Sequence, residues 1–145
     1  MVYLSFPFFF PNLTEANSRT TSPRDEGYNC IAWAAEDTER WWWPDSMEQN
    51  YWPPEVPREA TIEAFVQAYG LQGYSQRSDP TIEFGRQKVA IYADRNGNPT
   101  HAARQLPDGW WASKLGREID IEHELTALDG PLYGSAVVIL ARTLE

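Results

Sequence analysis

The chain has 145 residues, 42% of them hydrophobic and 14% aromatic, a composition typical of a folded globular protein with a hydrophobic core. Its formal net charge of −9 excludes a nucleic-acid partner bound mainly through phosphates, because such binding needs a basic surface. A single cysteine excludes an intrachain disulfide and a cysteine-based zinc site, and it is compatible with a reducing cytoplasm.

The first 27 residues are expected to form an N-terminal arm and a loop. The opening run M-V-Y-L-S-F-P-F-F-F-P is apolar, but it lacks a basic n-region and contains two prolines, so it fits neither a signal peptide nor a membrane span. Residues 11–27 are polar and rich in turn-forming residues, which favours a loop. We therefore expect a packed arm, no membrane partner and a cytoplasmic location, and export as an effector stays open.

A helix is expected directly after this loop. Residues 28–34 read Y-N-C-I-A-W-A, and the alanine and glutamate content favours a helix over residues 31–40. Asn29 is a suitable N-cap, because its short side chain can accept a hydrogen bond from a backbone N–H of the first turn. This placement puts Cys30, the only cysteine, in the first turn of the helix.

Residues 41–58 contain four of the seven tryptophans and four prolines. Proline removes a backbone donor and fixes φ, so an irregular aromatic segment is expected here rather than a helix. Some of these rings would complete the core, as we expect for Trp41 and Trp42. Trp43 and Trp52, together with Trp33 of the preceding helix, are expected to line a substrate groove.

A second helix and then a β-meander are expected in the remainder of the chain. Residues 61–70 have helical spacing, with Thr61 as N-cap and Gly70 at the end. After residue 87 the apolar residues alternate, and Asn96-Gly97 predicts a hairpin turn. Helices followed by antiparallel strands predict the α+β class, in one domain over residues 1–145. The expected strands cover residues 88–93, 100–106, 110–114 and 133–142.

The two histidines do not match a metal site. His101 and His123 have acidic neighbours, but their spacing fits no H-E-x-x-H pattern, so neither a metal nor a cofactor is expected. Asp120, Glu122 and Glu124 alternate with apolar residues and are expected on a solvated strand or helix face. A glycosidase is not favoured, because nothing sets one carboxyl group apart from the others. The chain also has no phosphate-binding glycine motif and no G-x-S-x-G.

Cys30 and His101 are candidates for a thiol nucleophile and its base. A helix N-terminus and a nearby imidazolium both lower the pKa of a cysteine. Such a nucleophile also needs a base at hydrogen-bond distance, oriented by a third group. His101 lies near the start of the strand after the 94–99 turn, so its side chain can leave the sheet toward a packed helix. Antiparallel pairing around the next turn can bring Ser113 or Lys114 close to His101, and Ser113 is expected to orient the ring.

The order of these residues resembles the papain-like thiol hydrolases in the broad sense, which include amidases, deamidases and transglutaminase-type acyl transferases. Cys30 followed by I-A-W-A, His101 followed by alanine, and Ser113 three places before Gly116 match the surroundings of that superfamily's catalytic residues. This resemblance implies a papain-like α+β core in which the helix carrying Cys30 packs on an antiparallel β-meander. The motifs Y-N-C-I-A-W-A, R-W-W-W-P, K-V-A-I-Y-A, T-H-A-A-R and S-K-L-G also resemble a family of small uncharacterised bacterial proteins.

Two features depart from the peptidase pattern. Arg24 stands near the place of the peptidases' oxyanion-hole glutamine, so the hole would need the backbone N–H of Cys30 with the side chain of Asn29 or Tyr28. The third member is a serine, which is a weaker orienting group than asparagine, and Asp120 is the alternative orienting residue.

Two functions of different classes follow from these residues. The first is a cysteine-nucleophile hydrolase or acyl transferase that acts on an amide of a protein or peptide, of the peptidase, amidase or deamidase type. The second is a binding or immunity module without turnover, in which the acidic surface meets a basic protein partner. In that second case Cys30 would be one of the many buried cysteines that are inert.

Overall fold

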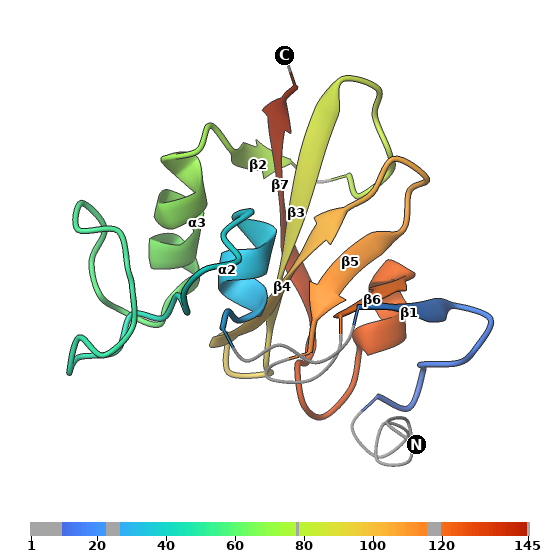
Figure 1. The fold of residues 1–145 in the computed structure, drawn as a ribbon, viewed down its shortest axis with the longest axis horizontal. Helices are drawn as coiled ribbons and strands as arrows, with labels where there is room; N and C mark the ends of the chain where they lie inside the picture. The colour runs from blue at the N-terminus through green and yellow to red at the C-terminus, as the bar shows by residue number, and fades with distance from the viewer. Residues whose placement is uncertain (1–9, 23–26, 78, 116–119, 145) are drawn as a thin grey trace.

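The computed structural model describes residues 10–22, 27–77, 79–115 and 120–144 (Figure 1). Residues 1–9 of the predicted N-terminal arm, Arg24 and Gly116 lie outside these residues. The elements, in chain order, are β1 (Ser18–Ser22), α2 (Cys30–Ala34), α3 (Ile62–Gly70), β2 (Ser75–Arg77), β3 (Arg86–Ala93), β4 (Pro99–Gln105), β5 (Trp111–Lys114), β6 (Asp120–His123), the 3-10 helix η1 (Leu125–Leu128) and β7 (Ser135–Thr143).

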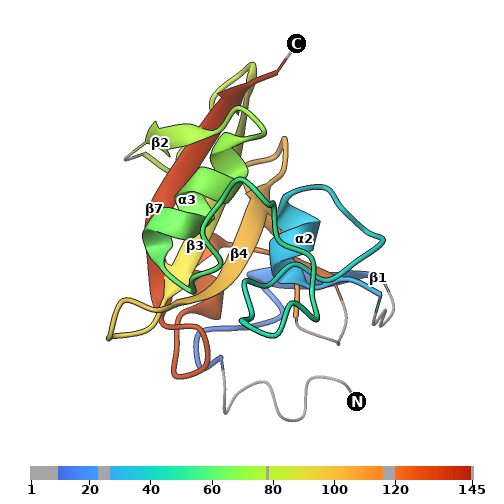
Figure 2. The ribbon, with the colours of Figure 1, turned by 90° about the vertical axis from the view of Figure 1, so that its left-hand side faces the viewer.

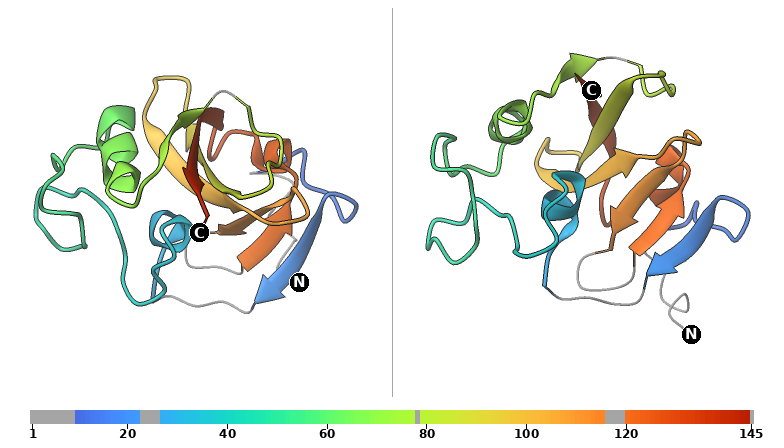
Figure 3. Two further views of the ribbon diagram at one scale, coloured as in Figure 1. Left: turned by 90° about the horizontal axis from the view of Figure 1, so that it is seen from above. Right: turned by 45° about the horizontal axis from the view of Figure 1, so that its top comes forward.

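Most of the regular structure belongs to one antiparallel sheet. Its strand order is β1-β6-β5-β4-β3-β7-β2, and every neighbouring pair is antiparallel. Figure 3 shows β1, β6 and β5 side by side at one end of this sheet. Because seven strands form the sheet and α3 is the one helix of substantial length in the described residues, the fold is mainly β. The predicted α+β, papain-like fold is therefore wrong.

Two local features explain the difference. The helix expected over residues 31–40 ends at Ala34, and Glu36 two residues later has a left-handed φ of 65°, which a helix cannot accommodate. The loop expected over residues 11–27 contains β1, an edge strand made of polar residues. Arg19 of β1 bonds to Glu122 on the neighbouring strand, so pairing and side-chain contacts hold a strand that has no apolar alternation.

The acidic segment after residue 119 is also placed differently from the prediction. It forms β6 between β1 and β5, with Asp120, Ile121 and His123 buried and Glu122 half-buried. Because β6 is paired on both edges and packs against a core, its buried side chains are not exposed to solvent. The prediction of a solvated acidic face is therefore wrong for Asp120.

The sheet separates two hydrophobic cores. The helices α2 and α3 cover one face, as Figure 2 shows for α3 over β3 and β7 and α2 beside β4, and η1 lies on the other side. Inward-facing residues alternate along β3, so Val89 and Ile91 join the core under the helices while Ala90 and Tyr92 join the second core. The site described below lies where the N-terminal end of α2 meets this sheet.

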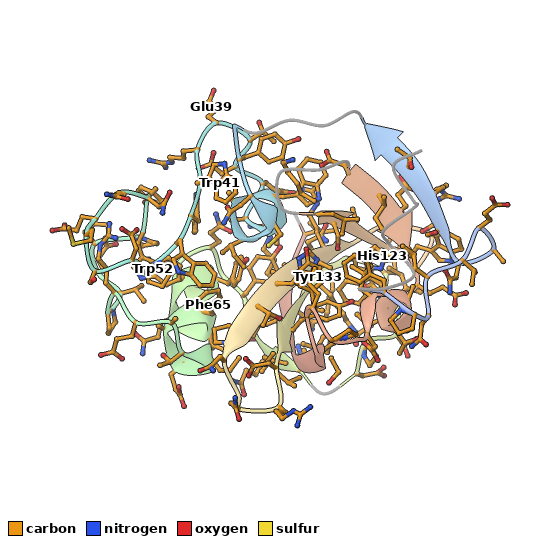
Figure 4. All side chains as sticks on the ribbon, turned by 90° about the horizontal axis from the view of Figure 1, so that it is seen from below. Glu39, Trp41, Trp52, Phe65, His123 and Tyr133 are labelled. Carbon is orange, nitrogen blue, oxygen red and sulfur yellow. The ribbon has the colours of Figure 1, made fainter. Side chains whose placement is uncertain are left out.

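The tryptophan- and proline-rich segment is irregular, as predicted, and two of its rings pack on Phe65 of α3. Trp52 is buried, donates from Nε1 to the carbonyl oxygen of Pro57 at 3.0 Å and packs on Phe65 with ring centroids 5.1 Å apart (Figure 4). Trp43 is half-buried, with its ring edge-on to Phe65 at 5.6 Å. The structure places Trp52 in the core under this segment rather than on a groove wall.

None of the helices in the described ranges is both long and apolar enough to cross a membrane.

Candidate active site

The side chain of Asn29 fixes the start of α2. Its Oδ1 atom accepts hydrogen bonds from the backbone N–H groups of Ala32, at 3.1 Å, and Trp42, at 3.0 Å. Its Nδ2 atom donates to the carbonyl oxygen of Trp42 at 2.7 Å. The predicted N-cap is confirmed. Because both ends of the amide are engaged, Asn29 ties α2 to residue 42 and is not directed at the thiol as an oxyanion donor.

Cys30 is the first residue of α2 and lies against β4 and β5. These two strands pair through Arg104 with Ala112 and Gln105 with Trp111, and α2 contacts both strands. The Cys30 side chain is buried. Burial raises the pKa of the thiol to about 11, although nearby backbone N–H groups, that of Ala102 first, act in the opposite direction. At neutral pH the group is therefore a thiol.

His101 of β4 is fully buried on the face of the second core. Its ring stacks on Tyr133, with centroids 4.1 Å apart and planes 9° apart, and meets the edge of Tyr92 at 5.2 Å. Its Nε2 atom is 2.9 Å from Oγ of Ser113. The structure thus brings His101 and Ser113 together in the arrangement expected of a base and its orienting hydroxyl.

The chain of contacts continues beyond Ser113 to a residue that the sequence prediction did not assign to the site. Oγ of Ser113 is 2.7 Å from Nε2 of His123, and Nδ1 of His123 is 2.8 Å from the carbonyl oxygen of Glu124. Burial lowers the pKa of His123 to about 4 and that of His101 well below 6.5, so both rings are neutral at neutral pH. The row His101–Ser113–His123 is entirely enclosed by protein.

The predicted hydrogen bond between the thiol and the imidazole is not seen among the described residues. The backbone N–H of Ala102, the residue next to His101, acts to lower the pKa of Cys30. Nδ1 of His101 is buried and has no hydrogen-bond partner in the part of the chain that the structure describes. Cys30 packs with Ala102 in the core under the helices, whereas the His101 ring packs on Tyr92 and Tyr133 of the second core, so the two side chains lie on different sides of the sheet.

Tyr28 and Asp120 form a second polar group close to α2. The hydroxyl of Tyr28 donates to Oδ2 of Asp120 at 3.1 Å, and the Tyr28 ring stacks on Trp33 at 5.8 Å. Nζ of Lys114 lies 5.0 Å from the centroid of the Tyr28 ring, and the positive charge of Lys114 acts to lower the pKa of Cys30. Asp120 thus contacts Tyr28, and it is Ser113 that contacts the His101 ring.

Of the three tryptophans predicted to line a groove, Trp33 is the one that belongs to the helix of Cys30. It is half-buried, and the guanidinium of Arg104 lies 4.6 Å from its ring centroid. In the described ranges, no three histidine, cysteine, aspartate or glutamate side chains are grouped so that they could hold a metal ion.

The fold is a mainly-β domain in which a short helix places a buried cysteine against β4, a strand that also carries a buried histidine. Residues 19–141 match a family described as a domain of unknown function (DUF7689), and the chain belongs to that family. No curated protein and no solved structure matches it. Nothing in these comparisons links the chain to papain-like peptidases or supports the sequence motifs on which the resemblances rest.

Proposed function

We propose that the protein is a cysteine-nucleophile hydrolase or acyl transferase that acts on an amide. One observation supports the proposal: Cys30 packs with Ala102, the residue next to a buried His101 whose Nδ1 atom has no hydrogen-bond partner among the described residues. An imidazole nitrogen without a partner in a closed interior costs free energy, so its presence needs an explanation. A base awaiting a proton is such an explanation.

The proposed reaction begins from a neutral thiol and a neutral imidazole. The sulfur of Cys30 bonds to the amide carbonyl carbon while the thiol proton moves to Nδ1 of His101. The tetrahedral intermediate then loses its amine, which takes the proton back from His101, and a thioester on Cys30 remains. Water completes a hydrolysis, or a second amine completes a transfer. The backbone N–H of Ala102 is the proposed donor to the developing oxyanion.

The mechanism requires Cys30 and His101, which share no hydrogen bond in the described part of the chain, to approach each other when substrate binds. Catalytic hydrogen bonds are often long or absent without substrate and form in the complex. A neutral pair also suits a buried site, because a thiolate–imidazolium pair would carry two charges away from water. A protein or peptide amide is the proposed substrate class.

The alternative function is a binding module without turnover. The specific observation in its favour is the burial of Cys30 with a thiol pKa of about 11, as expected for an inert cysteine. The acidic surface implied by a net charge of −9 would then bind a basic protein partner.

The two functions differ in the reactivity of the thiol. The full-length protein is treated with chloroacetamide at neutral pH, and alkylation is followed by intact mass. Because the chain has one cysteine, a Cys30→Ser variant gives the background. We expect His101→Gln to slow alkylation about 100-fold, the lower end of the contribution of a general base. Equal, slow rates in the wild type and His101→Gln would contradict the enzyme and support the binding module.

A further inference from the structure

The proposed mechanism uses His101 and Ser113 but leaves His123 without a role. His123 is fully buried, in contact with Ser113 on one side of its ring and with the carbonyl oxygen of Glu124 on the other. The chain has only two histidines, and a single hydroxyl group connects their rings. This arrangement determines where each hydrogen atom lies.

The carbonyl oxygen of Glu124, like any backbone carbonyl oxygen, can only accept a hydrogen bond. Nδ1 of His123 must therefore carry a hydrogen, which leaves Nε2 of the neutral ring as an acceptor. Ser113 has one hydroxyl hydrogen and must donate it to that Nε2 atom over 2.7 Å. Oγ of Ser113 is then left to accept from Nε2–H of His101 over 2.9 Å. With its hydrogen on Nε2, the neutral His101 ring has a bare Nδ1 atom.

We propose that His123 is a positioning residue: through Ser113 it fixes the tautomer of His101 and keeps Nδ1 of His101 unprotonated. The use of that atom as a base rests on the proposed function, whereas the direction of the hydrogen bonds does not. His123 acts in this account through Ser113 and does not contact the reacting atoms.

The surroundings support a single arrangement of these hydrogens. His101, Ser113 and His123 have no exposed surface, so water does not compete for their polar atoms. Tyr133 stacks on the His101 ring and holds its plane, which keeps Nε2 directed at Ser113. A protonated His123 would donate hydrogen bonds from both ring nitrogens. Ser113 would then accept from His123 and donate to His101, which reverses the direction of both hydrogen bonds. Burial, which lowers the pKa of His123 to about 4, keeps the ring neutral at neutral pH.

Nuclear magnetic resonance of the full chain, labelled with ¹⁵N-histidine, tests the tautomers directly. Long-range ¹H–¹⁵N spectra at neutral pH should show two neutral rings of opposite type, one protonated at Nδ1 and one at Nε2. His123→Gln, which removes one set of signals, assigns the Nδ1–H form to His123. Two Nε2–H rings, an imidazolium, or an Nδ1–H form of His101 would overturn the proposal.

Two variants of His123 separate positioning from mere packing. Glutamine can accept from Ser113 and donate to Glu124, so His123→Gln should keep His101 in the Nε2–H form. Leucine has a similar size but can neither accept nor donate a hydrogen bond. In His123→Leu, part of the His101 population should therefore carry its hydrogen on Nδ1. It should also slow alkylation of Cys30 about tenfold, the factor associated with one hydrogen bond. An unchanged His101 tautomer in His123→Leu would contradict the proposal.

The outcomes distinguish this proposal from the proposed function. If the wild-type tautomers are as stated but His101→Gln leaves the rate of alkylation unchanged, the proposed hydrogen bonds are correct and the proposed enzymatic function is wrong. If the tautomers differ, the role of His123 is refuted whatever the rate of alkylation. Should His123→Leu fail to fold, the wild-type and His123→Gln spectra still decide.

Discussion

Replacing Asn29 with alanine is expected to lower the free energy of unfolding by about 3–5 kcal/mol. The substitution leaves the backbone N–H of Ala32 and both the N–H and C=O groups of Trp42 without their partners. All three bonds are buried, and a buried polar group left unpaired costs about 1–3 kcal/mol. Chemical denaturation of the wild type and Asn29→Ala measures the difference.

Thr61 provides the matched control for Asn29. It caps α3 through a single hydrogen bond from the N–H of Ala64, at 3.2 Å, and is half-buried. Thr61→Ala should therefore cost about 1 kcal/mol, as usual for an N-cap. Equal losses in the two variants would show that the bonds to Trp42 add nothing, and that Asn29 is an ordinary cap.

Gly134→Ala is expected to destabilise the protein by more than about 4 kcal/mol, a loss reserved for severe steric or burial defects. A Cβ atom at Gly134 would lie 1.9 Å from the carbonyl oxygen of Ala93, where neither backbone can move without breaking pairing. Gly134 also exchanges two backbone hydrogen bonds with Gly130, at 2.9 and 3.0 Å. These bonds fix the turn that carries Tyr133, so the stacking on His101 should weaken as well.

Gly97→Ala separates steric overlap from backbone strain. Gly97 has a φ of +83°, close to the +76° of Gly134, but a Cβ atom there would meet nothing within 4 Å. A left-handed conformation costs a non-glycine residue about 1–2 kcal/mol. Thermal and chemical denaturation should show that smaller loss for Gly97→Ala, and similar losses in both variants would refute the steric account of Gly134.

Local signals in the sequence predicted the local structure. The N-caps Asn29 and Thr61 are confirmed by their side-chain hydrogen bonds. The hairpin between β3 and β4 follows from Asn96-Gly97, where the glycine supplies the positive φ that the turn needs. In each case a few neighbouring residues determine the backbone conformation.

Features that depend on distant partners could not be predicted in this way. The first helix ends early at Ala34, and Glu36 beyond it forms ion pairs with Arg104 and Arg142 from distant strands. The polar strand β1 is ordered by pairing with β6. Papain-like architecture was inferred from three short motifs, which do not determine strand order.

The same limit applies to the candidate site. Ser113 was correctly expected near His101, because one short turn joins their strands. His123 comes from a further strand, and the register that pairs Trp111 with His123 and Ser113 with Ile121 places it on the face of Ser113. The alternation of residues 120–123 indicates that Ile121 and His123 share one face of a strand. The acidic residues, however, favour an exposed strand.

The central claim is that His101 activates Cys30, and the pH dependence of Cys30 alkylation tests it most directly. The pKa of His101 is lowered below 6.5, so the base is neutral and available at every higher pH. The wild-type rate should therefore be nearly constant from pH 6.5 to about pH 8. An unassisted thiol with a pKa of about 11 reacts as thiolate, and its rate rises about tenfold per pH unit. His101→Gln should show that rise, and a wild-type profile with the same slope would contradict the claim.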